Sequence, residues 1–209
     1  MSSLYLDHFR LSEAPFGITP NGKFFFEGQA RGAILEALHH AVLDDDGIIT
    51  VVGEVGSGKT MLCRMLADRL PRDQVDLVYL ANPSFGPREI LHSMVADWGL
   101  KVPAGQPLVL SIQAALLERH AQGRRAVVLI DEAHLIPRAS NTMYRRFLDG
   151  LKRQNPLLKV IGFTATPYRL DSGRLHEGKD AIFTDIAFEV SVRELIDAGY
   201  LAPLVSKRM

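Results

Sequence analysis

The sequence predicts an α/β fold in which a parallel sheet of about five strands carries helices on both faces. Three observations predict this class. Short β-branched or apolar runs alternate along the chain with longer segments whose apolar residues recur at helical spacing. The first run, 48–52, leads through a glycine-rich turn into a helix. Another run, 126–130, contains no polar residue and ends in two carboxylates, as expected of a strand buried on both faces.

The turn after the first strand has the pattern G-x-x-x-x-G-K-T. It consists of Gly53, Glu54, Val55, Gly56, Ser57, Gly58, Lys59 and Thr60. Glycines allow backbone N–H groups to approach phosphate oxygens, and the N-terminus of the following helix adds the positive end of a dipole. The pattern predicts that Lys59 reaches the β- and γ-phosphates of a nucleotide and that Thr60 binds Mg²⁺. It therefore predicts the core of a P-loop NTPase.

Asp131 and Glu132 follow the apolar run 126–130, in the arrangement called Walker B. Ligands of open α/β sheets bind at the carboxyl ends of the strands. We therefore expect Asp131 to bind Mg²⁺ and Glu132 to orient the attacking water, because phosphoryl transfer requires mainly positioning and charge stabilisation. The chain between the glycine turn and Asp131 is long enough for two βα units, as parallel strands require.

The remaining elements follow from periodicity and from glycine and proline stops. Helices are expected at 29–43, 61–70, 87–98, 108–120, 141–154 and 192–198, and further strands at 75–80, 157–163, 183–190 and 201–205. Thr164 and Thr166 follow the fourth strand, and their hydroxyls would approach the γ-phosphate if that strand lies between the two motif strands; a plain Thr-Pro strand end is the alternative. Residues 168–180 are expected to form a mobile, charged loop.

The chain divides into an aromatic N-terminal arm, 1–30, and a core, 31–209. The arm combines aromatic and turn residues, so a long regular helix is not expected there. We expect it to pack over the nucleotide end of the sheet. Its aromatic residues would either line an adenine pocket or simply extend the core.

Composition and charge narrow the class of protein. The chain is 47% hydrophobic and 23% charged, with 24 basic and 24 acidic residues, so its net charge does not favour nucleic acid. Residues 138–209 carry 12 basic and 8 acidic side chains, which either favours DNA binding or is a solvated surface. The single cysteine, Cys63, excludes an internal disulfide and is expected to be a buried thiol. With no apolar stretch of membrane-spanning length, a cytoplasmic protein is expected.

Two family resemblances rest on these residues. Residues 1 to about 137 resemble the AAA+ ATPase domain of the general secretion pathway protein A (ExeA-type) family, through 5–9, 15–20, 53–60, 82–83 and 129–133. Residues from about 131 to 209 resemble the first RecA-like domain of superfamily II DEAD/DEAH-box helicases of the RadD type, through 131–134, 143–147, 162–169 and 192–201. Together they imply a chimera joined at 131–137, with an AAA+/RecA-like core and no lid domain.

The resemblances imply ATP as substrate with Mg²⁺, and they leave a homo-oligomer open. Three functions follow: an ATPase of AAA+ type, a DNA-dependent ATPase or helicase fragment that cannot unwind alone, and a nucleotide-binding scaffold without turnover. In the helicase-like reading His134 couples hydrolysis to strand movement; otherwise it is a surface or capping histidine. Guanine is not the expected base, because no Asn-Lys-x-Asp motif occurs. Turnover is expected to be low in isolation, because no arginine finger is assigned; Arg145, Arg146 and Arg169 are candidates, and action between subunits is left open.

Overall fold

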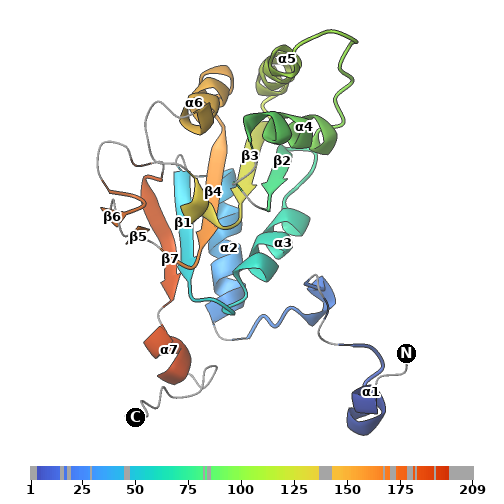
Figure 1. Cartoon of the computed structure of the whole chain (residues 1–209), viewed down its shortest axis with the longest axis vertical. Helices are drawn as coiled ribbons and strands as arrows, with labels where there is room; N and C mark the ends of the chain where they lie inside the picture. Colours follow the sequence, from blue (N-terminus) through green and yellow to red (C-terminus); the bar gives the residue numbers. More distant parts are fainter. Residues whose placement is uncertain are drawn as a thin grey trace.

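The computed structural model describes residues 4–14, 17, 20–28, 30–44, 48–81, 83, 86–136, 143–166, 168–169, 173–177, 181, 183–190 and 192–197. Its centre is a five-stranded sheet with the order β2-β3-β4-β1-β7 (Figure 1). The strands are β1 (Ile48–Gly53), β2 (Val75–Leu80), β3 (Arg125–Ile130), β4 (Lys159–Thr164) and β7 (Asp185–Val190). Each neighbouring pair is parallel. The predicted α/β class and the sheet of about five parallel strands are confirmed.

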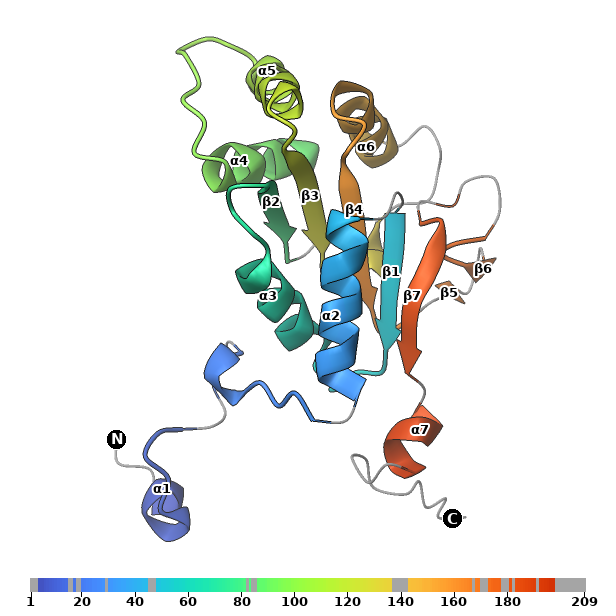
Figure 2. The same cartoon turned by 180° about the vertical axis from the view of Figure 1, so that it is seen from behind.

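Helices cover both faces of this sheet, as Figures 1 and 2 show from opposite sides. The helices are α2 (Ala30–Leu43) and α3 (Lys59–Arg69) on one face, and α4 (Pro87–Asp97), α5 (Leu108–Ala121) and α6 (Met143–Gln154) on the other. Strand β3 contributes to both layers, because successive side chains of a strand point to opposite faces. Val127 and Leu129 pack with α2 and α3, whereas Val128 and Ile130 pack with α4, α5 and α6.

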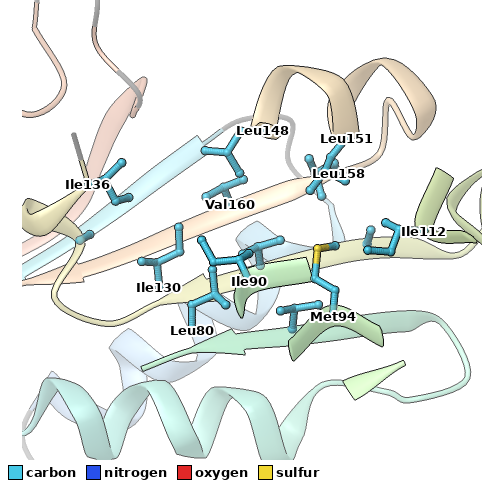
Figure 3. Packing of buried hydrophobic residues seen from close by; sticks show 14 of the residues in the cluster. Leu80, Ile90, Met94, Ile112, Ile130, Ile136, Leu148, Leu151, Leu158 and Val160 are labelled. Carbon is cyan, nitrogen blue, oxygen red and sulfur yellow. The ribbon is translucent and has the colours of Figure 1, made fainter. Parts of the chain in front are cut away.

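The second of these layers is shown in Figure 3. There Met94 of α4, Ile112 of α5 and Leu148 of α6 form one buried cluster with Ile130 of β3 and Val160 of β4. Each of these side chains is at most 5% exposed to solvent. This packing fixes β3 and β4 rigidly side by side, and these are the strands whose carboxyl ends carry the acidic and threonine motifs.

Strand order and register bring the three motifs to one edge of the sheet. Strand β4 lies between β3 and β1, and all three end at the same edge because they are parallel. Val52 is level with Thr164, and Ile130 is level with Gly162. The glycine turn, Asp131 and Thr164 therefore lie at the ends of adjacent strands, and the fourth strand lies between the two motif strands, which was the condition set for Thr164 and Thr166.

Gly162 of β4 sits where two neighbours approach the backbone closely. A Cβ built on Gly162 would lie 2.6 Å from Cε1 of Phe183 and 2.8 Å from Cβ of Ala133, closer than van der Waals contact allows. Both neighbours are buried, and Ala133 follows directly on Glu132. Because Gly162 has no side chain, the turn after β3 and the segment before β7, which contains Phe183, can pack against β4.

Replacing Gly162 by alanine is expected to lower the free energy of unfolding by about 1–3 kcal/mol, because an added methyl group overpacks this contact. Chemical denaturation would measure the change. Gly150→Ala in α6 is the matched control, since a Cβ there meets no atom within 4 Å. In a helix interior that change is expected to stabilise by up to about 1 kcal/mol. Equal effects of the two substitutions would contradict the close-packing explanation.

The N-terminal arm differs from the prediction. Helix α1 (Leu4–Phe9) stands away from the sheet in both views, and Phe9 is exposed. Further along the described part of the arm, the short helix η1 (Gly22–Phe24) lies against α3. Arg10, the residue after α1, has a left-handed backbone with φ of 53°, a conformation that ends a helix. The arm was predicted to pack over the nucleotide end of the sheet, and residues 4–9 do not do so.

The segment after β4 also differs from the prediction. Two short strands, β5 (Tyr168–Arg169) and β6 (Gly173–Arg174), pair antiparallel within the stretch predicted to be a loop. Antiparallel strands can pair across a short connection. Strands of two residues are too short to show an alternation of apolar and polar residues in the sequence. Helix α7 (Val192–Asp197) agrees with the prediction, and the strand predicted at 201–205 lies outside the described residues. Among the described helices, none has the length and apolar character required to cross a membrane.

Candidate nucleotide site

The glycine turn between β1 and α3 has the backbone of a phosphate-binding loop. Gly56 and Gly58 have φ of 82° and 90°, in the region that favours glycine, and a Cβ at either position would meet open space. Glycine is thus needed there for backbone conformation. At Gly53 a Cβ would lie 2.8 Å from Oγ of Ser57, so the Ser57 hydroxyl would have to move to make room for it. Val55, at the tip of the turn, is 80% exposed.

Helix α3 begins at this turn and directs its free amides into it. Leu62 N donates to Gly58 O at 2.9 Å, and Gly58, as the N-cap, offers no side chain to the amides before Leu62. The first amides of a helix have no acceptor within it. They carry the positive end of the helix dipole, so the beginning of α3 is suited to bind an anion.

Lys59, the first residue of α3, binds the beginning of the glycine turn with its side chain. Its Nζ donates to the carbonyl oxygen of Glu54 at 2.9 Å. Burial lowers the pKa of Lys59, and the nearby carboxylates of Glu132, Asp131 and Glu54 oppose that shift. The ammonium group is therefore partly desolvated and surrounded by acceptors, and it lies beside the same turn as the free amides of α3.

Thr60 and Asp131 are in direct contact. Oγ1 of Thr60 donates to Oδ2 of Asp131 at 2.8 Å. Asp131 is buried, and its other oxygen accepts from the amide of Glu132 at 3.1 Å. A hydroxyl and a carboxylate oxygen are ligands of the kind that Mg²⁺ takes together with phosphate oxygens and water. The described residues hold no cluster of three or more His, Cys, Asp or Glu suited to a metal, and a site completed by phosphates requires none. The residues present fit Mg²⁺.

Glu132 has an unusual backbone. Its φ of 52° and ψ of 42° are left-handed, a conformation that costs a non-glycine residue about 1–2 kcal/mol. It begins the short helix η2 (Ala133–Leu135), and its side chain is 47% exposed. The strained turn separates the two carboxylates, so that Asp131 is directed to Thr60 while Glu132 remains accessible to water. Strain of this kind is commonly found at functional sites.

Thr164 and Thr166 differ in position. Thr164 is fully buried, and its hydroxyl lies 3.0 Å from Nδ1 of His134 and donates to the carbonyl of Thr166 at 3.1 Å. The side chain of Thr166 is exposed, so this residue meets Thr164 through its backbone. Nδ1 of His134 also lies 3.5 Å from Oε2 of Glu132. His134, which the sequence left open as a surface histidine, therefore connects Glu132 with Thr164.

Tyr79 was not predicted as part of the site. It lies near the end of β2, and its hydroxyl is 3.5 Å from Oδ2 of Asp131. Burial, and then the neighbouring Cys63 and Asp131, raise the pKa of Tyr79 to about 12. The group therefore stays a neutral donor beside the aspartate. The sequence places Tyr79 near the end of a predicted strand, but that this strand lies beside β3 is known only from the structure.

Cys63 lies in α3 as a fully buried thiol, as predicted. Burial raises its pKa well above the ordinary value, and the charge of Asp131 adds to the effect. Because the thiolate is the reactive form, we expect no reaction of the folded chain with an aromatic disulfide reagent at pH 8. In denaturant the same thiol is expected to react at once. Equal rates in both conditions, followed by absorbance, would contradict the buried placement.

Comparison with known proteins identifies the family. A family model described as AAA domain matches residues 42–167, which is more than half of the chain. The chain belongs to the AAA domain family. This AAA domain is 36% identical over 163 residues to general secretion pathway protein A of Aeromonas hydrophila, covering 76% of the chain and 29% of that protein. It is also 36% identical over 117 residues to tRNA 2-selenouridine synthase of Ectopseudomonas mendocina (strain ymp), covering 53% of the chain and 26% of that protein.

A solved structure agrees with the assignment of the fold. The ORC2 protein of Aeropyrum pernix in its ADP form matches 90% of this AAA domain and 53% of its own chain, with a TM-score of 0.52 and 16% identity. The match of the family model continues through 131–137 to residue 167. The comparisons thus support the AAA+ resemblance of the front half. They give no support to the helicase-like back half or to a seam at 131–137, which stay predictions.

Proposed function

We propose that this AAA domain binds ATP with Mg²⁺ and hydrolyses it to ADP and phosphate. The observation that carries the proposal is the 2.8 Å hydrogen bond between Thr60 and Asp131. These residues are 71 positions apart in the sequence and come from two separate motifs. Their contact joins the anion-binding turn to the acidic end of β3, which is the arrangement required to hold a triphosphate and a metal ion together.

The glycine turn and Lys59 would bind the β- and γ-phosphates. The free amides at the beginning of α3 donate to phosphate oxygens and place the positive end of the helix dipole near them. Lys59 exchanges the neutral carbonyl of Glu54 for a charged phosphate oxygen, and charge-assisted hydrogen bonds are about twice as strong as neutral ones. The hydrogen bonds that the turn and Lys59 would donate to a triphosphate are therefore stronger than those they donate within the chain.

Thr60 and Asp131 would hold Mg²⁺ through one hydroxyl and one carboxylate oxygen. When bound, the ion supplies positive charge against the β- and γ-phosphate oxygens. The two residues keep this position because Asp131 is fixed by the amide of Glu132. The rigid packing of β3 against β4 supports the same geometry.

Glu132 would orient the attacking water and accept its proton. The water oxygen bonds to the γ-phosphorus while the bond from that phosphorus to the β–γ bridging oxygen breaks, and ADP leaves with the electron pair. Thr164 would donate its hydroxyl hydrogen to the γ-phosphate, which requires it to leave the carbonyl of Thr166. His134 lies between Thr164 and Glu132 and would position both groups. Thr166 stays a predicted site residue, with its backbone supporting Thr164.

A phosphate-release assay tests this function. We expect turnover that depends on Mg²⁺ and stops when the metal is chelated. The rate should be low, because an arginine finger is worth roughly 10³ to 10⁵ in rate and none is assigned in this chain. Turnover no higher than that of heat-denatured protein would favour the scaffold alternative.

The same assay, run with single-stranded DNA, separates the DNA-dependent alternative. The stretch 138–209, which the sequence offers as a possible DNA-binding part, has exposed basic residues on α6, namely Arg146, Lys152 and Arg153. Stimulation by DNA that weakens steeply with salt would favour that alternative over a DNA-independent ATPase. A sizing column with and without ATP would test the homo-oligomer.

A further inference from the structure

The carboxylate of Asp131 meets donors from three parts of the fold. Oδ2 accepts from the hydroxyl of Thr60 on α3 at 2.8 Å and lies 3.5 Å from the hydroxyl of Tyr79 on β2. Oδ1 accepts from the amide of Glu132, in the turn after β3, at 3.1 Å. An ionised carboxylate has about four acceptor positions. Within the described part of the chain these donors take three of them, so about one remains for a metal ion or for water bound to it.

Strand pairing places Tyr79 next to Asp131. Tyr79 is level with Leu129 in the parallel pair of β2 and β3. The amide of Asp131 donates to Leu80 O at 2.9 Å, so the pairing continues one residue past β3. Because side chains two residues apart on a strand point to the same face, Tyr79, Leu129 and Asp131 lie on the face that α3 covers. The contact of the tyrosine with the carboxylate is therefore a consequence of the register of the sheet.

Arg64 lies on the other side of the Tyr79 hydroxyl. It follows Thr60 by one turn of α3, so both side chains lie on the same face of that helix. Burial raises the pKa of Tyr79 to about 12, and the charge and side-chain hydrogen bond of Arg64 oppose this shift. A guanidinium group has donors but no acceptor, so the hydroxyl hydrogen of Tyr79 points away from Arg64 and toward Asp131.

We propose that Tyr79 is a positioning residue for Asp131, which directs the remaining acceptor position of the carboxylate to the metal ion. The inference rests on the proposed function and deepens it. Thr60 and Tyr79 hold Oδ2 from α3 and from β2, so the carboxylate cannot turn without lengthening one of these contacts. Mg²⁺ requires near-ideal octahedral geometry, which a fixed carboxylate satisfies better than one that turns. A tyrosine hydroxyl also donates without adding a positive charge that would compete with the ion.

Tyr79→Phe removes only the hydroxyl and tests the proposal by isothermal titration of the intact chain. A non-hydrolysable ATP analogue is titrated with and without Mg²⁺. The variant should bind the metal-free analogue as the unmodified chain does, because the glycine turn binds phosphate without Tyr79. The gain in affinity on adding Mg²⁺ should fall by roughly tenfold. This is the lower end of the range for losing a hydrogen-bond partner of a metal ligand, since the contact of 3.5 Å is long.

Ser111→Ala in α5 is the matched control. It also removes a hydroxyl whose oxygen is buried, one without a hydrogen-bond partner among the described residues, and α5 packs on the opposite face of the sheet from α3. Both affinities should stay unchanged in this variant. A loss of metal-free affinity in Tyr79→Phe as large as the loss with Mg²⁺ would indicate general damage to the site and would overturn the positioning role.

A double-mutant cycle provides a measurement that needs no metal. Chemical denaturation of Tyr79→Phe, of Asp131→Asn and of the double variant should show that the combined loss of stability is smaller than the sum, because both changes remove one contact. Additive losses, or a gain from Mg²⁺ that persists in Tyr79→Phe, would overturn the role of Tyr79 and leave the proposed function in place. No gain from Mg²⁺ in the unmodified chain would contradict the proposed function, and the role of Tyr79 with it.

Discussion

Replacement of Lys59 by alanine is expected to lower the affinity for ATP by roughly 100-fold or more, because it removes the charge-assisted donor to the phosphates. The ammonium group is already partly desolvated in the folded chain, and its pKa is lowered by burial. Binding of phosphate would therefore cost little additional desolvation of Lys59. Isothermal titration with ATP and Mg²⁺ measures the loss.

The matched control for this substitution is Lys101→Ala, which removes an exposed lysine from the loop before α5. It should bind ATP as the unmodified chain does. Circular dichroism should show the same helix content in both variants, so that a loss of affinity is not a loss of fold. Unchanged affinity of Lys59→Ala would contradict the assignment of the glycine turn to phosphate binding.

Replacement of Glu132 by glutamine is expected to preserve ATP binding and to lower turnover by roughly 10² to 10⁴, the range typical for loss of a general base. The amide keeps the size of the side chain and its contact region near His134. It cannot accept a proton from water. The phosphate-release assay measures the loss of turnover, and titration measures the preserved affinity.

Glu118→Gln in α5 is the control for charge removal, because Glu118 is exposed on the helix surface. Its turnover should equal that of the unmodified chain. Turnover of Glu132→Gln equal to that of the unmodified chain would show that another group activates the water.

His134→Asn adds a separate test of positioning: it should reduce the maximal rate while leaving the affinity for ATP unchanged.

Much of the fold could be predicted because the signals are local. The glycine turn, the apolar run before Asp131 and the helix stops at Pro71 and Gly123 each determine the backbone within a few residues. The contact of Thr60 with Asp131 follows from two such motifs and from the parallel arrangement of their strands. This part of the site therefore required only spacing and strand direction.

Other features depend on contacts between segments distant in the sequence. Thr164 and Thr166 have similar sequence surroundings, and only the register of β4 with β1 makes Thr164 the buried one. The contact of Tyr79 with Asp131 depends on which strand lies beside β3. Phe9 of helix α1 is exposed, although the aromatic residues of the arm were expected to pack over the nucleotide end of the sheet. Such features follow from packing, for which the sequence carries no short-range signal.

The most direct test of the account is the metal dependence of nucleotide binding. Isothermal titration would compare a non-hydrolysable ATP analogue with and without Mg²⁺, on the unmodified chain and on Asp131→Asn. The account predicts tighter binding with Mg²⁺ for the unmodified chain and little difference for Asp131→Asn, because Asp131 and Thr60 would hold the ion. An affinity that is the same with and without Mg²⁺, or a metal effect that survives in Asp131→Asn, would contradict it.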